Sequence, residues 1–462
     1  MIFSPLNDAH KNAFRSMVAP DRFSTGKSHL NLHAADQSFH APRRPDAVIW
    51  PVDREEVSRI LSYADAHRIP VTAWGAGTSM EGNPIPLFGG LVADFSRMNR
   101  ILDIRGTDFQ ADVEPGVIYQ DLNNQLRFKG LFFPPDPGAR ATIGGMIANN
   151  ASGPHTIRYG STRDCILRLT VVLAGGKVIR IGTRASKTSS GYDLLHLFIG
   201  SEGTLGLVVE ATVRLSGLPE ALSAAVAAFP TLESAGQAVR EIIRAGLDPA
   251  ALELMGPECI DLMNREHRLG LVGLPTIFME FHGPSREHLE TILALARELC
   301  REAGSTAFHS GLGREARDRI FRARHELGEM ILRRHPGCRV RVVDIAVPAS
   351  AYSEMIGCAQ KEMHRSSLTG YIFSHAGDGN LHVNLVGPKG DDGVWARIDE
   401  LAGRMVEQAL LFGGTATGEH GVGIGKRGFM EAEHGPSLEW MRRVKALFDP
   451  KGILNPGKIF LV

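Results

Sequence analysis

The spacing of hydrophobic residues predicts short strands and helices through the first half of the chain. Residues 46–53 form a short apolar run that fits a strand, and residues 54–68 carry hydrophobic residues at helical spacing. Ile69 and Pro70 end this helix, and a second strand follows at residues 71–74. Because two strands often follow one helix in this half, the pattern indicates an α+β domain rather than a regularly alternating parallel sheet.

The second half shows a different arrangement of elements. Residues 216–230 change in composition and mark a boundary. Beyond it, helices are predicted at residues 231–246, 286–304, 394–412 and 436–448, with strands that include 275–283 and 340–348. We therefore expect three parts: a first region at 1–218, a second region at 219–412 with an antiparallel sheet covered by helices, and a C-terminal segment at 413–462.

Composition places the chain among ordinary globular proteins of two or three domains. Its 462 residues are 43% hydrophobic and 22% charged, and 51 basic residues balance 51 acidic ones, so no nucleic-acid partner is expected. Five scattered cysteines without a C-x-x-C pair fit a reducing compartment. With neither a readable targeting sequence nor a membrane span, we expect a cytoplasmic protein, with peripheral membrane association as the alternative.

The stretch SHAGDGNLHVN at residues 374–384 raises the first question of chemistry. Asp378-Gly379 between apolar runs predicts a two-residue hairpin turn, which would place His375 directly opposite His382, with Asn384 on the same face. Two facing imidazoles can share a divalent cation, or they can be a surface pair. Spacing alone leaves both interpretations open.

A second stretch, TGEHGVGIGKRG at residues 417–428, offers a third ligand and a base, which the two histidines alone would not supply. Glu419 could be a third ligand beside the two histidines, which leaves coordination positions open as catalytic metals require. The adjacent His420 could be a general base near neutral pH. The alternative is a surface loop with a Glu-His pair.

Three glycine-rich stretches indicate a large nucleotide cofactor. They are WGAGTSMEGN at 74–83, the irregular segment at 133–160, and GSEGTLGLVVEATVRL at 200–215. A glycine-rich loop with unpaired backbone N–H groups suits a pyrophosphate, although each could also be an ordinary turn. Three of them at strand ends favour the cofactor.

Arg324 lies on the apolar stripe of a predicted helix, between Ile320 and Leu327. An arginine in this position usually extends to solvent or forms an ion pair. The sharper possibility is a bidentate clamp for a substrate carboxylate.

Taken together and in order, these motifs resemble the FAD-linked D-2-hydroxy-acid dehydrogenases, a group of the vanillyl-alcohol-oxidase type of flavoproteins. The motifs are GAGTSMEG, DVEPGV, FPPDPG, NNASG with RYG, GSEGTLGLV, SHAGDGNLH, TGEHGVG and DPKGILNPGK. The resemblance runs from about residue 40 to residue 458, and within the family it is strongest to the cytochrome-type D-lactate dehydrogenases. It implies a two-subdomain FAD-binding domain of the vanillyl-alcohol-oxidase (PCMH) type, completed by the C-terminal tail, and a cap that carries the substrate.

The resemblance also implies roles for particular residues. His375, His382 and Glu419 would bind one divalent metal ion (Zn, Mn or Fe), Arg324 and Asn384 would contact the substrate, and His420 would be the base. FAD would be bound by Gly75, Ala76, Gly77, Thr78, Ser79, Pro135, Asp136, Thr142, Gly145, Asn149, Ser152, Gly153, Tyr159, Glu202, Gly203, Thr204, Gly206, Val208 and Asn455.

The implied reaction is oxidation of D-lactate to pyruvate, with metal-assisted proton abstraction and hydride transfer to FAD. Ser79 and Met80 stand where covalent-flavin relatives carry His or Cys, so noncovalent FAD is expected.

The alternatives to this function are a D-2-hydroxyglutarate dehydrogenase, a glycolate oxidase subunit, or a noncatalytic flavin-binding subunit. Gly328 and Val342 replace residues expected for a second substrate carboxylate, while Arg339 and Arg341 keep that possibility open. The expected partners are a 2-hydroxy acid, an electron acceptor (cytochrome, quinone or electron-transfer flavoprotein) and, in a homodimer, a second copy of the chain.

Overall fold

A computed structural model describes residues 3–461, and the chain divides into two compact units. Of the described residues, unit 1 contains 3–152, 160–218 and 419–461, and unit 2 contains 153–159 and 219–418. In this division unit 1 ends at residue 218 and resumes at residue 419, and residues 153–159 of the first half belong to unit 2. The three parts expected from the sequence, with bounds at 218 and 412, remain predictions.

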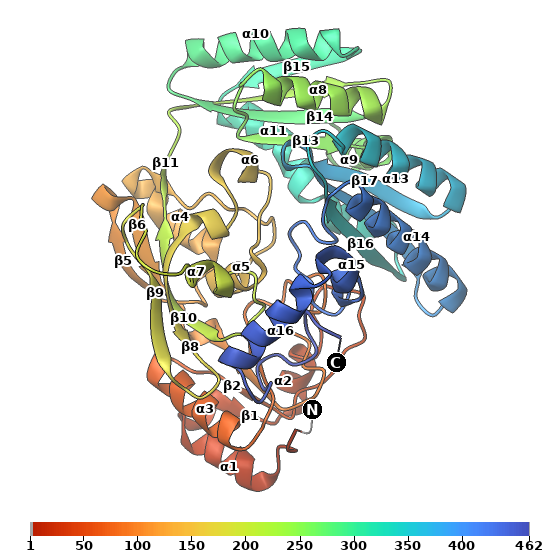
Figure 1. The fold of residues 1–462 in the computed structure, drawn as a ribbon. Helices are drawn as coiled ribbons and strands as arrows, with labels where there is room; N and C mark the ends of the chain where they lie inside the picture. Colours follow the sequence, from red (N-terminus) through yellow and green to blue (C-terminus); the bar gives the residue numbers. More distant parts are fainter. Residues whose placement is uncertain (1–2, 462) are drawn as a thin grey trace. The chain divides into compact units, whose positions relative to one another are not determined.

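Unit 1 is built on two main sheets (Figure 1). The four-stranded sheet has the order β1 (Phe23–Ser24), β2 (Ala47–Ile49), β4 (Leu91–Asp94), β3 (Val71–Trp74). The five-stranded antiparallel sheet has the order β5 (Ile101–Arg105), β6 (Gln110–Val113), β10 (Leu207–Arg214), β8 (Ile166–Val172), β9 (Val178–Gly182). Strands β7 (Leu131–Phe132) and β11 (Ser216–Gly217) form a separate pair.

The helices of unit 1 differ in how many apolar side chains they bury in its core. They are α1 (Asp8–Ser16), α2 (Lys27–Leu32), α3 (Arg54–Ala66), α4 (Tyr119–Leu126), α5 (Ile143–Asn149), α7 (Leu195–Phe198), α15 (Met430–His434) and α16 (Ser437–Phe448). In α3 the Asp53 side chain caps the first turn by accepting from the N–H of Glu56, and Ile60 and Leu61 are buried. Helix α5 lies in the segment that we expected to be irregular, where Thr142 caps it.

Unit 2 contains one seven-stranded sheet in which every neighbouring pair is antiparallel. The order is β15 (Ala307–Leu312), β12 (Ala221–Ala228), β14 (Thr276–Gly283), β13 (Ala251–Met255), β17 (Thr369–His375), β18 (Asn380–Pro388), β16 (Cys338–Ala346). This arrangement confirms the α+β class and the antiparallel sheet predicted for this half of the chain.

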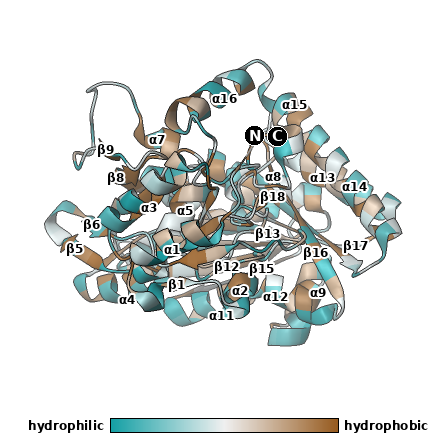
Figure 2. Cartoon of the chain, turned by 90° about the horizontal axis from the view of Figure 1, so that it is seen from below, coloured by the Kyte–Doolittle hydropathy of each residue, from teal (hydrophilic) through white to brown (hydrophobic). Residues whose placement is uncertain are grey.

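Helices cover both faces of this sheet. One face packs against α9 (Pro257–His267), α11 (Arg314–His325) and α12 (Leu327–Arg334), with a core that includes Phe278, Phe321 and Met330. The other face is covered by α8 (Leu232–Arg244), α10 (Arg286–Glu302), α13 (Tyr352–Ser366) and α14 (Asp392–Leu411). The remaining helix of unit 2 is α6 (Thr156–Tyr159). The helices carry both hydrophobic and hydrophilic residues (Figure 2), as elements with one buried side must.

No helix within residues 3–461 combines the length and the apolar character needed to cross a membrane.

Candidate active site

The hairpin of unit 2 that carries the two histidines has a different register from the one we predicted. His382 pairs with Phe373, and His375 pairs with Asn380. The reason is the loop: a 3-10 turn over Ala376–Asp378 and a left-handed Gly379 (φ 72°) replace the two-residue turn. A Cβ on Gly379 would lie 2.2 Å from the carbonyl oxygen of Val347, so the position requires glycine.

The two histidines nevertheless lie together on one face of the sheet. They are diagonal rather than direct neighbours, and their ring centroids are 5.2 Å apart with the planes at 88°. Both side chains are buried, at 6% exposure for His375 and 2% for His382. Asn384 also lies on this face, opposite Val342.

His375 is held by a buried glutamate that the sequence analysis did not identify. Its Nδ1 lies 2.7 Å from Oε1 of Glu253, which is fully buried on β13 directly opposite His375. A carboxylate on Nδ1 sets the ring orientation and makes Nε2 the nitrogen that can bind a metal. The signal available in the sequence was one acidic residue inside the apolar run ALELM.

Arg324 of helix α11 binds the same glutamate. Its Nε donates to Oε2 of Glu253 at 2.6 Å, and its guanidinium lies 5.3 Å from the centre of the Phe373 ring. Burial raises the pKa of Glu253, but the charges of His375 and Arg324 and their hydrogen bonds outweigh this and lower it to about 2. Arg324 is therefore ion-paired, which is one of the two alternatives that the helix pattern left open. Its guanidinium group retains further N–H donors for a substrate.

His382 lies beside a second buried acid, Asp344 of β16. Its Nδ1 is 3.6 Å from Oδ1 of Asp344, which also accepts from the amide group of Asn380 at 2.7 Å. The other oxygen of Asp344 accepts from the N–H of Gly418 at 3.0 Å and from the Thr417 hydroxyl at 3.1 Å. Asp344 thus fixes the strand of His382 and the end of the segment that leads to Glu419.

Within unit 1, Glu419 and His420 lie among residues of the glycine-rich segments. Ser152 donates to Oε2 of Glu419 at 3.0 Å, and the Asn149 amide group donates to the carbonyl oxygen of His420 at 3.3 Å. Nε2 of His420 is 3.7 Å from Oε1 of Glu419. Two residues expected to line a cofactor therefore also position the loop that carries the expected ligand and base.

Glu202 has a similar role from a third segment. Its buried carboxylate accepts from the N–H groups of Val422 at 2.7 Å and Gly423 at 3.0 Å. Burial raises the pKa of this carboxyl group, while those hydrogen bonds act in the opposite direction. The backbone oxygen of Glu202 accepts from the amide group of Asn455 at 2.8 Å, which joins the C-terminal tail to the same region.

The first glycine-rich loop suits a pyrophosphate on its backbone geometry. In the described part of the chain, none of the backbone N–H groups of Ala76–Ser79 donates a hydrogen bond. Gly77 has φ 69°, and a Cβ on Gly75 would lie 2.4 Å from Oγ1 of Thr142, so the loop packs closely on the start of α5. Consecutive N–H groups without protein acceptors can bind an anion, and these residues fit the phosphates of a dinucleotide.

Other residues expected at the cofactor have local structural partners. Asp136 accepts from the Tyr119 hydroxyl at 2.5 Å, and the Tyr159 hydroxyl bonds to Nδ1 of His282 at 2.7 Å. A Cβ on Gly206 would lie 2.6 Å from the Val171 side chain, so this glycine permits packing of the sheet. Gly153 and Tyr159 belong to unit 2; the other expected cofactor residues belong to unit 1.

Comparison with known proteins identifies the class. Residues 218–459 match the model for FAD linked oxidases, C-terminal domain, and residues 45–182 match the FAD binding domain model. The chain is 38% identical to a probable mitochondrial D-lactate dehydrogenase of Danio rerio, with 97% of this chain and 91% of the relative covered. It is 36% identical to the mitochondrial D-lactate dehydrogenase [cytochrome] of Arabidopsis thaliana, over 96% of this chain and 78% of the relative.

Solved structures support the same fold. The 4-ethylphenol oxidase of Gulosibacter chungangensis, in its isoeugenol complex, superimposes with a TM-score of 0.82 at 19% identity, over 99% of this chain and 98% of that one. This likeness confirms the PCMH-type FAD-binding fold expected from the sequence. Fold and matches together define an FAD-dependent oxidoreductase that acts on CH–OH groups. The chain belongs to the FAD-linked oxidase family, among the FAD-linked D-2-hydroxy-acid dehydrogenases.

Proposed function

We propose that this protein oxidises D-lactate to pyruvate, using noncovalent FAD and one divalent metal ion bound by His375, His382 and Glu419. The observation that carries the metal assignment is the bond between Nδ1 of His375 and the buried Glu253, at 2.7 Å. A buried carboxylate on the far nitrogen of an imidazole is the usual partner of a metal-binding histidine. The D-lactate dehydrogenases of Danio rerio and Arabidopsis thaliana support the substrate.

Each cofactor contributes one kind of chemistry. A divalent cation supplies a Lewis acid that lowers the pKa of the substrate hydroxyl group. FAD supplies the acceptor for two electrons. The N–H groups of Ala76–Ser79 would hold the pyrophosphate of FAD, and Asn455 would lie near the flavin ring.

The remaining steps fall to side chains of the protein. In this proposal an imidazole nitrogen of His420 takes the proton of the C2 hydroxyl group. The guanidinium of Arg324 binds the substrate carboxylate through the N–H groups that Glu253 does not use, and Asn384 contacts the substrate. Glu253 would therefore align a metal ligand and the carboxylate-binding arginine at once, which fixes the orientation of the reacting groups.

Unit 2 favours a substrate with a single carboxylate. Strand alternation puts Arg339 and Arg341 on the face of β16 opposite to Asp344, which pairs with His382. Arg341 forms an ion pair there with Asp399 of α14. Because neither arginine shares a face with His382, a second carboxylate, as in D-2-hydroxyglutarate, has no cationic partner from this strand.

The electron acceptor is proposed to be a cytochrome, because the Arabidopsis thaliana relative is named as a cytochrome-linked enzyme. A quinone or an electron-transfer flavoprotein is the alternative. The two D-lactate dehydrogenases named above are mitochondrial proteins. The compartments proposed for this chain are therefore the cytoplasm and an organelle.

The test is anaerobic reduction of the bound flavin by a panel of 2-hydroxy acids, with metal analysis of the same sample. D-lactate should bleach the flavin, L-lactate should not, and D-2-hydroxyglutarate should react more slowly. The His420→Ala variant should retain FAD and lose bleaching by D-lactate. Faster bleaching by D-2-hydroxyglutarate than by D-lactate would overturn the substrate assignment, and full activity of the metal-stripped protein would overturn the metal assignment.

A further inference from the structure

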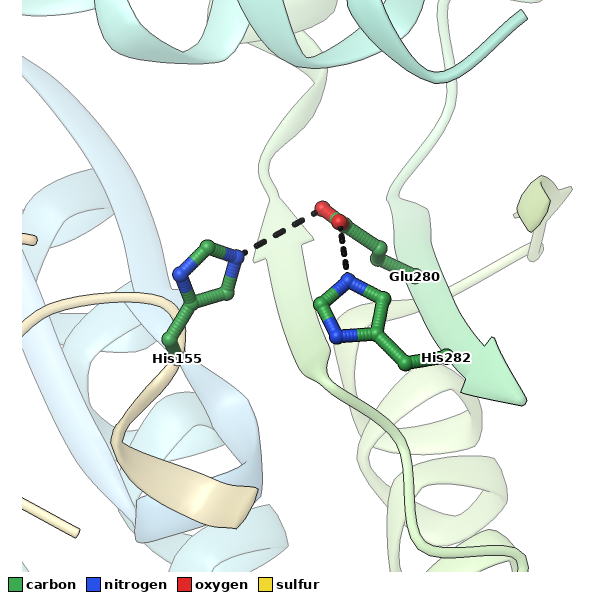
Figure 3. Close-up of side chains that lie close together, drawn as sticks. All are labelled: His155, Glu280 and His282. Carbon is green, nitrogen blue, oxygen red and sulfur yellow. Dashed lines mark hydrogen bonds and ion pairs between the residues drawn. The ribbon is translucent and has the colours of Figure 1, made fainter. Parts of the chain in front are cut away.

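Unit 2 contains a second cluster of metal-binding side chains, away from the hairpin of His375 and His382. It consists of His155, next to helix α6, and Glu280 and His282 on strand β14 (Figure 3). Nε2 of His282 lies 2.7 Å from Oε1 of Glu280, and Nε2 of His155 lies 3.7 Å from Oε2 of the same carboxylate. Figure 3 shows the two imidazoles converging on the carboxylate from different segments of the chain.

The cluster is enclosed rather than superficial. Glu280 is 2% exposed and His282 is 6% exposed, and the side chain of His155 is 12% exposed. One donor atom from each of the three residues lies within 4.8 Å of the others. Two imidazole nitrogens and one carboxylate oxygen form a donor set that suits Zn²⁺ and similar divalent cations, with room for water as a fourth ligand.

Two further residues support the orientation of the donors. The Tyr159 hydroxyl lies 2.7 Å from Nδ1 of His282, the nitrogen that points away from the carboxylate. Nε of Arg317 donates to Oε2 of Glu280 at 2.9 Å. Hydrogen bonds of this kind to the far side of an imidazole and to a ligating carboxylate are characteristic of metal sites.

We propose that His155, Glu280 and His282 bind a divalent cation, with Zn²⁺ as the best-suited ion, at a site separate from that of His375, His382 and Glu419. Nothing in the family matches or in the proposed reaction requires this second site. It joins β14 to residues 153–159, a segment that is distant in sequence but belongs to the same unit. A cation bound there would link residues 153–159 to strand β14 of the sheet.

Binding of the cation changes the tautomer of His282. Without a cation, a proton on Nε2 can donate to Glu280, and Nδ1 accepts from the Tyr159 hydroxyl. With Nε2 bound to the cation, the ring proton resides on Nδ1 and donates to the Tyr159 oxygen. Tyr159 serves both states because a hydroxyl group can donate and accept.

The ion pair with Arg317 sets an expected order of affinities. Arg317 compensates part of the negative charge of Glu280, and a shared carboxylate attracts a cation less strongly. We therefore expect this site to fill after the site of His375 and His382 in a zinc titration.

The experiment is a count of bound zinc on the full-length, FAD-loaded protein. The protein is stripped with a chelator, checked for retained flavin, and equilibrated with Zn²⁺ by dialysis. The native protein should bind about two ions per chain, and the His155→Gln and His375→Ala variants should bind about one each. His364→Ala, which removes an exposed histidine of α13, should leave the count at about two.

The pattern of counts separates this inference from the proposed function. About one ion in the native protein, retained by His155→Gln and lost by His375→Ala, would overturn the second site and leave the proposed metal intact. About one ion, lost by His155→Gln and retained by His375→Ala, would support the second site and overturn the metal of the proposed function. Binding of no ion by the native protein would overturn both.

Tyr159→Phe provides a second measurement that does not remove a ligand. It keeps the ring and deletes the acceptor for Nδ1–H, so the weaker zinc affinity should fall roughly 10–100-fold while the stronger one stays unchanged. Unchanged affinity at both sites would overturn the proposal, because the tautomer that it requires would then not depend on Tyr159.

Discussion

Arg317 and Arg324 lie seven positions apart on helix α11, and each donates through Nε to a different buried glutamate of the sheet. The distances are 2.9 Å from Arg317 to Glu280 and 2.6 Å from Arg324 to Glu253. Seven positions are two helical turns, about 10 Å along the axis, so both arginines point to the same side. One helix thus supplies cations to two carboxylates, and each carboxylate also holds a histidine.

The two ion pairs provide a matched test of the role of Arg324. Lysine in either position keeps the charge but loses the planar fork, so both Arg317→Lys and Arg324→Lys should lose a similar small amount of stability. If Arg324 also binds the substrate carboxylate, Arg324→Lys alone should raise KM for D-lactate, roughly 10–100-fold, corresponding to about 1.4–2.7 kcal/mol. Steady-state kinetics with both variants check this, and equal KM values would contradict the assignment.

Glu253→Gln should weaken metal binding without removing a metal ligand. Glutamine keeps the size of the side chain but loses the charge that orients His375, and loss of such a partner typically costs 10–100-fold in metal affinity or activity. Zinc affinity and kcat/KM for D-lactate are the measurements. Glu258→Gln, at an exposed position of helix α9, is the control and should behave like the native protein.

Gly75→Ala should impair FAD binding. The added methyl group would lie 2.4 Å from Oγ1 of Thr142, which must move or displace the loop, at a cost of about 1–3 kcal/mol. Gly175→Ala is the matched control, because a Cβ there meets nothing within 4 Å. The measurement is the flavin content of the two purified variants. Full flavin content in Gly75→Ala would show that this loop does not approach the cofactor closely.

Because of Lys458, the free energy of unfolding of the protein should increase with pH in alkaline solution. The residue is 2% exposed, and burial lowers the pKa of its amino group to about 8 from 10.5, while Glu202 and Asp36 act in the opposite direction. Between these two values the unfolded chain binds more protons than the folded one, so this group adds stability as the pH rises from 8 towards 10.5.

The Lys458→Met variant isolates this contribution. The native protein should gain on the order of 2–3 kcal/mol relative to the variant across that range. Urea unfolding at several pH values measures the difference. A constant difference between the two proteins would contradict the lowered pKa, even though the variant also loses the hydrogen bonds to Ile85 and Asn455.

Much of the architecture was predictable from the sequence because local patterns determine local structure. The apolar stripe of residues 54–68 predicted helix α3, and the helices and strands predicted after residue 218 indicated an antiparallel sheet covered by helices. Glycine-rich motifs in a fixed order identified the family. The roles of the individual site residues remain predictions.

The hairpin shows where local rules were insufficient. Asp378-Gly379 is a strong turn signal, and it predicted direct pairing of His375 with His382. In the structure the loop includes a 3-10 turn, and Gly379 fits closely against the carbonyl of Val347, a residue outside the hairpin. The register therefore follows from a loop longer than the two-residue turn that local rules predicted.

What the sequence determined by itself was the set of chemical groups: histidines, acids and glycine-rich loops in an order typical of one family. What only the tertiary structure decided was which groups meet. Glu253 is 122 positions from His375 and 71 from Arg324, and Glu280 is 37 from Arg317. These pairs form because the register of a seven-stranded sheet and the packing of one helix place them on a common face. The register and the packing are stabilised by contacts throughout the core of unit 2, and not by the paired residues alone.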